Sequence, residues 1–238
     1  MIDLHTHILP GMDDGAKDVQ MSLDMLRTQK AQGVDTVALT SHFYPVKENI
    51  ERFLKRRGES AKVLARAILA LPEAEQKEIP ELVLGAEVAW VPNLAHMEGL
   101  ERMCLGKSRY MLLELPFEPW TMQMIDQIYH LYDRTGITPV IAHLDRYQKI
   151  QKREIFEEIF ALGVPIQLGT DQLFHWWNKR QIFRLLEEEG RFLLASDCHN
   201  LQSRKPNLKA AMDVVEQKMG REVTEQLKKQ AEKIMQMQ

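Results

Sequence analysis

Short apolar runs alternate with longer amphipathic stretches along most of the chain. The apolar runs have the length of buried strands and predict seven of them, at residues 2–5, 36–40, 82–87, 111–115, 139–142, 165–168 and 192–196. The helical period between and after them predicts helices at residues 20–32, 50–71, 123–134, 154–161, 178–189, 207–218 and 222–235. This alternation is typical of βα units around a parallel sheet.

Glycines support the predicted boundaries. Gly33, Gly136, Gly163 and Gly190 each follow a helical stretch and precede a strand, as helix C-caps do. Seven βα units in 238 residues predict a single α/β domain over residues 1–238. We expect a distorted, seven-stranded TIM-like barrel, because a regular barrel has eight strands. A doubly wound open sheet is the alternative.

Composition narrows the class of protein. An apolar fraction of 45% and a charged fraction of 27% are those of a globular chain. The net charge of -3 disfavours a nucleic-acid-binding domain, which is normally basic. The first residues show no signal peptide, no apolar run is long enough to span a bilayer, and two cysteines make no disulfide framework. We therefore expect a cytoplasmic protein.

One stretch is strongly basic. Residues 52–57 read Arg-Phe-Leu-Lys-Arg-Arg within a predicted amphipathic helix. Charge runs usually lie on exposed helix surfaces, so we interpret this stretch as a solvated face, with a partner-binding patch as the alternative.

Histidines and carboxylates stand at or just beyond the ends of the predicted strands. In a βα barrel all these strand ends lie on one face, where active sites are found. The candidates along the chain are His5, His7, Asp14, His42, Glu87, Glu114, His143, Asp197 and His199.

The spacing of these residues predicts a metal centre. Side chains two residues apart on a strand point the same way, so His5 and His7 can address one ion, and Asp197 and His199 repeat the spacing. The alternative, core histidines and helix-capping acids, would leave buried carboxylates without cations, at a high cost. About nine donors exceed the needs of a single zinc, and imidazole with carboxylate suits manganese, iron or zinc. Such ions clamp phosphoryl groups and activate water.

Several motifs then resemble a known family. Asp-Leu-His-Thr-His at residues 3–7, Asp-Asp-Gly at 13–15, Gly-Ala-Glu at 85–87, His-Leu-Asp-Arg-Tyr at 143–147 and Ser-Asp-Cys-His-Asn at 196–200 occur in order. They resemble the polymerase-and-histidinol-phosphatase (PHP) superfamily. Within it, the chain is most similar to the manganese-dependent protein-tyrosine phosphatases of bacterial capsule and exopolysaccharide systems.

The resemblance implies a PHP fold with three divalent metal ions, manganese first, with iron or zinc as alternatives. It assigns His5, His7, Glu87 and Asp197 to the first ion, Glu87, Glu114 and His143 to the second, and Asp14, His42 and His199 to the third. Arg146 and Arg204 stand where the family binds phosphate, and a guanidinium fits phosphate oxygens bidentately.

The chain departs from the family in two places. Residues 169–177 read Gly-Thr-Asp-Gln-Leu-Phe-His-Trp-Trp where the family has small residues, and Lys205 interrupts an Arg-Pro-Pro sequence. Trp176 and Trp177 are expected either to pack on a helix or to flank a substrate ring. These departures put the substrate rim, and not the metal ligands, in doubt.

Cys198 and Arg204 also fit the Cys-x5-Arg pattern of cysteine-dependent tyrosine phosphatases. That mechanism needs a thiolate of low pKa in a loop of backbone amides. The intervening residues include no glycine, and the charge of Asp197 raises a neighbouring thiol pKa. Strand alternation also turns Cys198 away from Asp197 and His199. The metal mechanism is therefore favoured.

The resemblance implies hydrolysis of phosphotyrosine by metal-activated hydroxide. Its expected partner is a tyrosine-phosphorylated protein, namely a bacterial tyrosine kinase or its substrates, in control of capsular or exopolysaccharide synthesis. A small-molecule phosphatase, such as one for histidinol phosphate, needs the same metals and remains an alternative. A phosphodiesterase and a non-catalytic metal-binding barrel are weaker ones.

Overall fold

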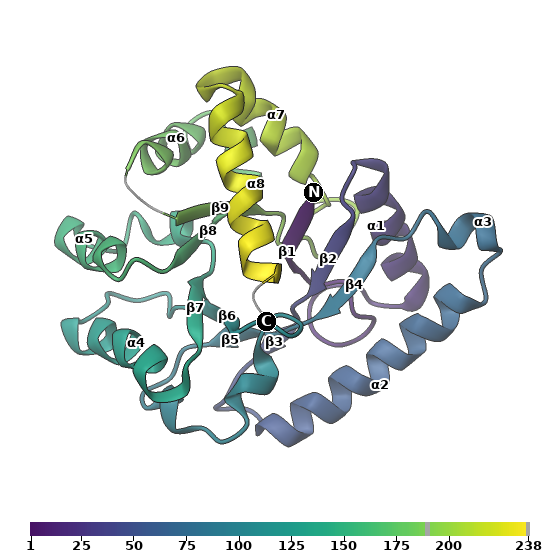
Figure 1. Ribbon diagram of the computed structural model, residues 1–238, viewed down its shortest axis with the longest axis horizontal. Helices are drawn as coiled ribbons and strands as arrows, with labels where there is room; N and C mark the ends of the chain where they lie inside the picture. Colours follow the sequence, from purple (N-terminus) through teal and green to yellow (C-terminus); the bar gives the residue numbers. More distant parts are fainter. Residues whose placement is uncertain (189–190, 237–238) are drawn as a thin grey trace.

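The computed structural model describes residues 1–188 and 191–236 (Figure 1). Its strands are β1 (Ile2–Thr6), β2 (Thr36–Leu39), β3 (His42–Phe43), β4 (Glu81–Leu84), β5 (Glu87–Ala89), β6 (Tyr110–Glu114), β7 (Thr138–Ile141), β8 (Pro165–Gly169) and β9 (Arg191–Ala195). The α-helices are α1 (Val19–Ala31), α2 (Ile50–Leu69), α3 (Glu73–Gln76), α4 (Met122–Thr135), α5 (Arg153–Ala161), α6 (Lys179–Glu187), α7 (Leu208–Met219) and α8 (Arg221–Gln236). Four short 3-10 helices are η1 (Leu94–His96), η2 (Leu100–Met103), η3 (Leu144–Tyr147) and η4 (Asp171–Phe174).

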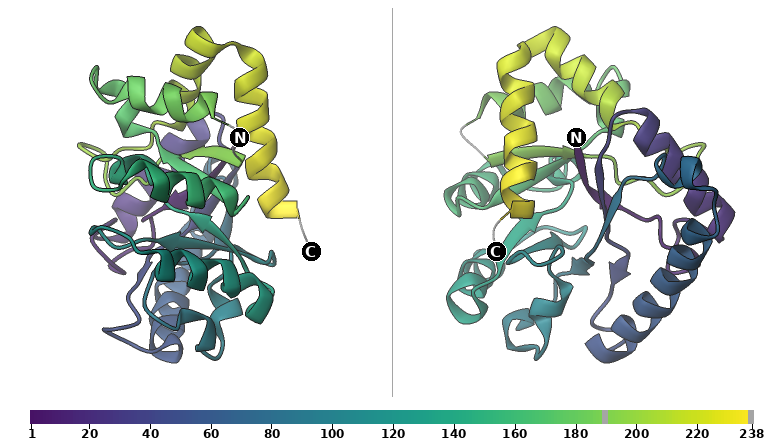
Figure 2. Two further views of the ribbon diagram at one scale, coloured as in Figure 1. Left: turned by 90° about the vertical axis from the view of Figure 1, so that its left-hand side faces the viewer. Right: turned by 45° about the vertical axis from the view of Figure 1, so that its right-hand side comes forward.

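All strand pairs between these elements are parallel, and they form two sheets. One sheet has the order β1-β2-β4 and the other the order β3-β5-β6-β7-β8-β9. Neighbours therefore follow the chain, unlike a doubly wound sheet, whose order reverses at a switch point. Most of the helices lie around the outside of the strands in both views of Figure 2. The prediction of an α/β fold with parallel strands is confirmed.

The third predicted strand, residues 82–87, is in fact two strands, β4 and β5, separated by Gly85 and Ala86. The Gly85 carbonyl accepts a hydrogen bond from Arg57 Nη1 at 2.7 Å. A Cβ at Gly85 would lie 2.8 Å from Leu105 Cδ2, so the chain is closely packed at the break. β2 is likewise followed by a separate β3, which the pattern did not predict. The breaks divide the strands between the two sheets.

The end of β1 contacts the segment after β9. Thr6 and Cys198 form an isolated parallel bridge. His7 N donates to Cys198 O at 2.9 Å, and Asp197 N donates to His5 O at 2.8 Å. These bonds join the first and last strand positions, although the strands do not form one continuous closed barrel within the described residues.

Apolar side chains form two separate clusters. The larger one packs the outward faces of the strands against the helices. The smaller one lies between the strands and includes Leu4, Leu112 and Leu193, together with Ala231 and Ile234 of α8. Figure 1 shows α8 crossing in front of β9 and β1 near the N-terminus of the chain. Helix α8 therefore covers the amino end of the strand assembly, opposite the strand ends that bear the predicted ligands.

The helices lie within two residues of their predicted bounds, apart from the short α3 and the 3-10 helices, which were not predicted. Gly33, Gly136 and Gly163 have φ values of 77°, 66° and 63°, as predicted for residues that end helices. Gly190, and the last residue of the predicted helix 178–189, lie outside the described residues.

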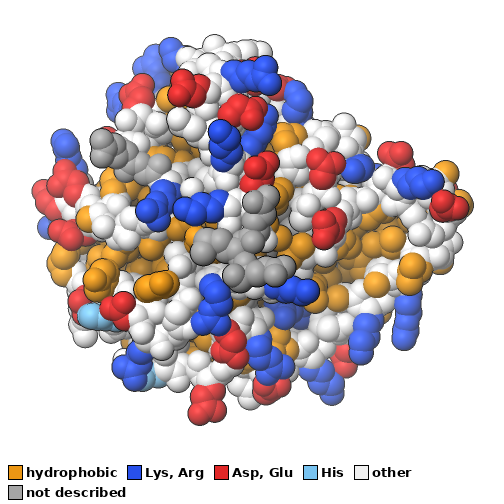
Figure 3. Space-filling model, viewed as in Figure 1, with side chains coloured by type: hydrophobic (Ala, Val, Ile, Leu, Met, Phe, Trp, Pro, Cys, Tyr) orange, Lys and Arg blue, Asp and Glu red, His pale blue; other side chains and the backbone are white. Residues whose placement is uncertain are grey.

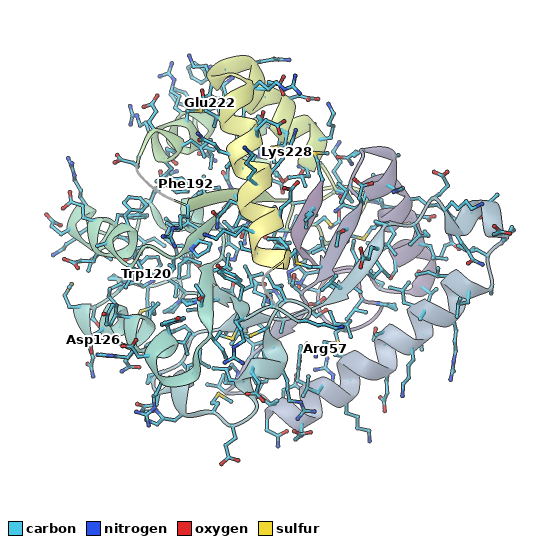
Figure 4. All side chains as sticks on the ribbon, in the orientation of Figure 1. Arg57, Trp120, Asp126, Phe192, Glu222 and Lys228 are labelled. Atoms are coloured by element: carbon cyan, nitrogen blue, oxygen red, sulfur yellow. The ribbon has the colours of Figure 1, made fainter. Side chains whose placement is uncertain are left out.

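The basic stretch of α2 is not simply a solvated face. Arg57 is buried, and its Nη1 and Nη2 donate to the carbonyls of Gly85 and Arg102 at 2.7 and 3.1 Å. Figure 4 labels Arg57 beside α2. Burial, with a smaller effect of Arg102, lowers the pKa of Arg57 to about 10. The interpretation is wrong for Arg57, because helical spacing brings it onto the inner side of α2, while Arg52 and Lys55 are exposed.

Charged side chains of both signs are spread over the face seen in Figure 3. Apolar side chains are also exposed there, between α2 and β4, where Leu69 and Leu84 lie. Among the helices of the described ranges, all are too short or too polar to cross a bilayer.

Ile234 provides a test of the interior packing by α8. Its side chain is fully buried, so Ile234→Ala removes three carbons and leaves a cavity. We expect a loss of about 2 to 4 kcal/mol in the free energy of unfolding, measured by urea denaturation. Glu232→Ala, on the exposed side of α8, is the matched control and should change it by less than about 0.5 kcal/mol. Equal effects of the two changes would contradict this role for α8.

Candidate metal centre

The predicted ligands lie at the carboxyl ends of the strands, and the structure brings all nine together. They come from β1 and its following loop, β3, β5, β6, and the segments after β7 and β9. Glu87 opens β5 and Glu114 closes β6, and these residues project to the same side as the interior residue Leu112. The parallel arrangement of the strands explains why residues far apart in sequence meet here.

Four buried side chains form the centre of the cluster. His5 Nε2 and His7 Nε2 are 3.1 Å apart. Each of these atoms lies 3.2 to 3.3 Å from Glu87 Oε2 and 3.3 Å from Asp197 Oδ1. The first ligand group implied by the resemblance is thus compact.

The second implied group adjoins the first through Glu87. His143 Nε2 lies 3.0 Å from Glu87 Oε1 and 3.6 Å from Glu114 Oε1. His42 Nδ1 also approaches these carboxylates, at 2.8 Å from Glu87 Oε2 and 3.7 Å from Glu114 Oε2. Glu87 therefore contacts every histidine of the first two groups, as well as His42.

The third implied group lies beside His7. Asp14 Oδ1 is 3.3 Å from His199 Nε2 and 3.5 Å from His42 Nε2. The rings of His7 and His199 stack with centroids 3.8 Å apart. His7, Asp14, His42 and His199 each offer a donor atom within 4.8 Å of the others, which is the spacing of a metal site.

Two of these residues have backbone conformations that L-residues rarely adopt. His143 has a φ of 31° and Asp197 a φ of 51°. Their amide groups are held by neighbours, since His143 N donates to Gln167 Oε1 at 2.6 Å and Asp197 N donates to His5 O. Such conformations cost about 1 to 3 kcal/mol each and gather at functional sites, where the surrounding structure enforces them.

The electrostatics of the cluster favour charged carboxylates. Burial alone would raise the pKa of Glu87, but the charge of His5 and the nearby imidazoles of His143 and His42 hold it well below its usual value. Burial would lower the pKa of His7, but the Asp13, Asp197 and Glu87 carboxylates raise it well above its usual value. Glu114, by contrast, has a raised pKa because of burial and the charge of Glu87. Glu87 and Asp197 are therefore held in the charged, metal-binding form.

Unsatisfied polar atoms test whether this cluster fits metal ions. Ten buried side-chain nitrogen or oxygen atoms of the described residues form no hydrogen bond. Five of them belong to the predicted ligands: His42 Nδ1, Glu87 Oε2, His143 Nδ1, Asp197 Oδ1 and His199 Nε2. Buried polar atoms normally find partners, so such a concentration of free donor atoms in one cluster fits metal ligation. The residues present therefore fit divalent ions.

Arg146 and Arg204 meet on the outer oxygen of Asp197. Arg204 Nη2 donates to Asp197 Oδ2 at 2.7 Å, and Arg146 Nη2 contacts the same oxygen. Arg204 Nη1 also lies 3.7 Å from Asp14 Oδ2. Both arginine side chains are about one-third exposed, so they border the centre from the solvent side. Such a pair of forks suits the oxygens of a phosphate group.

Two side chains lie behind the ligands: Asp13 belongs to the Asp-Asp-Gly motif, and Gln167 was not predicted from the sequence. Asp13 Oδ2 accepts a hydrogen bond from His7 Nδ1 at 2.8 Å, which turns His7 Nε2 toward the centre. Gln167 Oε1 lies 3.1 Å from His5 Nδ1 and has the same effect on His5. Outer partners of this kind orient ligating histidines. Gln167 alternates with Ile166 and Leu168 on β8, so its side chain points to the interior of the strand assembly. This alternation is the sequence signal that would have indicated its role.

Cys198 does not face the centre. Its side chain is fully buried, burial raises the pKa of its thiol well above the usual value, and its Sγ accepts from Gln29 Nε2 at 3.7 Å. The following loop is organised by Asn200, whose Oδ1 accepts from the amides of Gln202 and Ser203. A cysteine nucleophile is inconsistent with this geometry.

Trp176, Trp177 and two further histidines lie outside this cluster. Trp176 and Trp177 are exposed, with ring centroids 4.3 Å apart. Arg180 of α6 lies over the Trp176 ring at 5.2 Å from its centroid, whereas Trp177 presents most of its aromatic surface to solvent. His130 is exposed on α4 between Asp126 and Asp133, and His96 lines a pocket near the same helix.

The comparisons with known proteins agree with this geometry. The family model described as "Capsular polysaccharide synthesis, CpsB/CapC" matches residues 1–236. The chain belongs to the CpsB/CapC family. The resemblance to capsule-system phosphatases, which the motifs indicated, is confirmed at this level.

Individual relatives match over nearly their whole length. The chain is 31% identical to tyrosine-protein phosphatase CpsB of Streptococcus pneumoniae, covering 95% of this chain and 94% of that protein. It is 28% identical to tyrosine-protein phosphatase YwqE of Bacillus subtilis (strain 168), covering 99% and 91%. One solved chain, from crystal structures of YwqE and CpsB described as unique metal-dependent tyrosine phosphatases, matches with a TM-score of 0.82 and 29% identity. It covers 100% of this chain and 95% of that chain.

Gly15 tests the packing of the loop that carries Asp13 and Asp14. A Cβ at Gly15 would lie 2.0 Å from the carbonyl oxygen of His7, so the backbone would have to move. We expect Gly15→Ala to lower the free energy of unfolding by about 3 kcal/mol or more in urea denaturation. Gly58→Ala, in the open middle of α2, should instead raise it by about 0.5 to 1 kcal/mol. An unchanged free energy of unfolding in Gly15→Ala would contradict the close approach of Gly15 to the His7 carbonyl.

Asp13 tests the outer support of His7. Asp13→Asn removes the charged acceptor of His7 Nδ1, and we expect manganese to bind about 10- to 100-fold more weakly, by calorimetric titration of metal-free protein. Asp24→Asn, on the exposed surface of α1, serves as the control and should leave the affinity unchanged. Unchanged affinity in Asp13→Asn would show that His7 does not depend on this bond.

Proposed function

We propose that this protein is a metal-dependent protein-tyrosine phosphatase acting through metal-activated hydroxide. The observation that carries the proposal is the convergence of buried histidines and carboxylates beside two arginines at one strand-end face. Relatives that match along almost the whole chain are named tyrosine-protein phosphatases, which supports phosphotyrosine as the substrate.

The proposed centre holds three divalent ions, with manganese as the first candidate and iron or zinc as alternatives. The first ion would be held by His5, His7, Glu87 and Asp197, the second by Glu87, Glu114 and His143, and the third by Asp14, His42 and His199. Nitrogen and oxygen donors without thiolate support this choice of metals. When bound, such ions polarise a water molecule and offset the charge of phosphoryl oxygens.

The residues of the chain have distinct roles in this proposal. Asp13 and Gln167 hold His7 and His5 with their Nε2 atoms directed into the centre. Arg146 and Arg204 bind phosphoryl oxygens and neutralise the charge that accumulates on them. Their positions beside Asp197 put both guanidinium groups next to the ligands of the first ion. Phenolate is a fairly good leaving group because it is a weaker base than an alkoxide. The proposed mechanism therefore assigns no general acid to protonate it.

We further propose that residues 1–238 form one PHP-type domain whose strands make up a distorted seven-position barrel. Counting β2 with β3 and β4 with β5 as single positions supports seven. The proposed partner is a tyrosine-phosphorylated protein, a bacterial tyrosine kinase or one of its substrates, in the cytoplasm and in control of capsular or exopolysaccharide synthesis. The family description supports the capsule system. The names of the relatives do not favour a histidinol-phosphate phosphatase.

A hydrolysis assay tests the function. With manganese, we expect release of phosphate from a phosphotyrosyl peptide, faster than from histidinol phosphate, and abolished by a chelator. His5→Ala should lower kcat/KM by about 100-fold or more, since it removes a ligand outright. Cys198→Ser should stay within about threefold of the parent, because that thiol is buried and protonated.

The opposite pattern would reject the mechanism. Activity that survives the chelator and is lost in Cys198→Ser would indicate a cysteine nucleophile. A preference for histidinol phosphate would assign the protein to a different substrate class.

A further inference from the structure

A polar pocket of about 450 Å³ opens directly beside the metal centre. Asp14 and His42 line it on one side, so the pocket and the proposed third metal site share two residues. The other walls come from the loops after β1 and β3 and from the first turns of α2. Its remaining lining residues are Met12, Asp13, Tyr44, Lys47, Glu48, Arg52 and Arg56.

Tyr44 connects the pocket to the centre. Its ring stacks on the imidazole of His42, with centroids 5.1 Å apart and an interplanar angle of 26°. Lys47 Nζ lies 4.0 Å from the centroid of the same ring. A cation over an aromatic ring is attracted to it. The ammonium group of Lys47 is thereby kept close to the entrance of the metal centre.

The pocket has more cations than available anions. Of its three basic residues, Arg56 is engaged with Glu48 and with the carbonyl of Met12. Arg52 Nε reaches Glu48 only at 3.9 Å, and its side chain is 73% exposed. Lys47 forms no ion pair with a carboxylate of the described residues within 4.0 Å. Glu48 is thus the one carboxylate of the described pocket residues that pairs with any of these three basic side chains.

The two aspartates of the pocket do not restore the balance. Asp13 accepts hydrogen bonds from His7 Nδ1 and from the amides of Gly15 and His42. Asp14 faces His42 and His199. Asp14 is 63% exposed, but its Oδ1 lies near the two imidazoles and its Oδ2 lies 3.7 Å from Arg204 Nη1. Both acids thus have partners other than Lys47 and Arg52, whose positive charge is free to attract another anion.

We propose that this basic pocket is a substrate subsite for the carboxylate of an aspartate or glutamate close to the phosphotyrosine. The inference rests on the proposed function and deepens it, since it assigns the substrate class as acidic phosphotyrosyl segments. When the phosphate of a phosphotyrosine lies at the metal centre, the residues next to that phosphotyrosine in the peptide lie beside the basic pocket. In an extended peptide the side chains two residues away project to the same side, so these positions are the ones the pocket selects.

Paired peptides test the subsite. One has glutamate two residues before and two residues after phosphotyrosine in an otherwise Gly/Ala sequence, and the other has glutamine at both places. For the full-length protein with manganese, we expect kcat/KM to be about fivefold higher for the glutamate peptide, the scale of one or two exposed ion pairs. The preference should decrease as salt is raised from 0.05 to about 0.5 M, because exposed charges are screened.

Variants of α2 and its preceding loop identify the residues responsible. In the double variant Lys47→Gln with Arg52→Gln, the glutamate-to-glutamine ratio should fall to about one. Lys55→Gln is the matched control, since Lys55 lies three residues from Arg52 on the same helix, is exposed, and does not line the pocket. It should keep the preference of the parent protein. Using the ratio within each variant removes any general effect on turnover.

The outcomes separate this inference from the proposed function. Hydrolysis of neither peptide with manganese would reject the phosphatase function itself. Equal kcat/KM for both peptides in the parent protein would overturn the subsite alone. A preference that survives in the double variant, or that is equally lost in Lys55→Gln, would also overturn it, because the selectivity would then come from elsewhere or from the overall charge of the surface.

Discussion

The arrangement of the strand-end face depends on how the buried charge of Glu87 is offset. This carboxylate is almost inaccessible, yet its pKa is held low by His5, His143 and His42. A buried charge persists only where partners are fixed around it. The partners come from β1, β3 and the segment after β7, so the position of each of these elements is tied to one side chain of β5. The left-handed backbone of His143 belongs to the same constraint, because it directs that ring to Glu87.

Much of the fold could be predicted from the sequence because βα units repeat a simple pattern. The amphipathic period and the glycines that follow the helices predicted the helix bounds to within two residues. The ends of the predicted strands indicated where the ligands lie. The break between β4 and β5 could not be predicted in this way. It depends on a hydrogen bond from Arg57 to Gly85 and on the side chain of Leu105, contacts between segments far apart in the chain. Charge patterning alone likewise could not show that Arg57 is buried.

The candidate site was predictable in its ligands but not in its supports. Paired residues such as His5 and His7 can be recognised as candidate ligands from their spacing and from their position at a strand end. Asp13 and Asp14 are adjacent and chemically alike, yet one accepts from His7 Nδ1 and the other faces His199. Which of them does which depends on loop geometry that Gly15 makes possible by its close approach to His7. No periodic pattern encodes such a distinction.

The shared contact of Arg146 and Arg204 with Asp197 has a consequence for turnover. Their positive charges already have a partner in the resting protein, at the outer oxygen of a carboxylate whose inner oxygen faces the histidines. A phosphate arriving under the proposed mechanism therefore exchanges one anion for another and does not meet two unpaired cations. When inorganic phosphate departs, Asp197 takes the guanidinium groups back. Such an exchange favours release of the product phosphate over its tight retention.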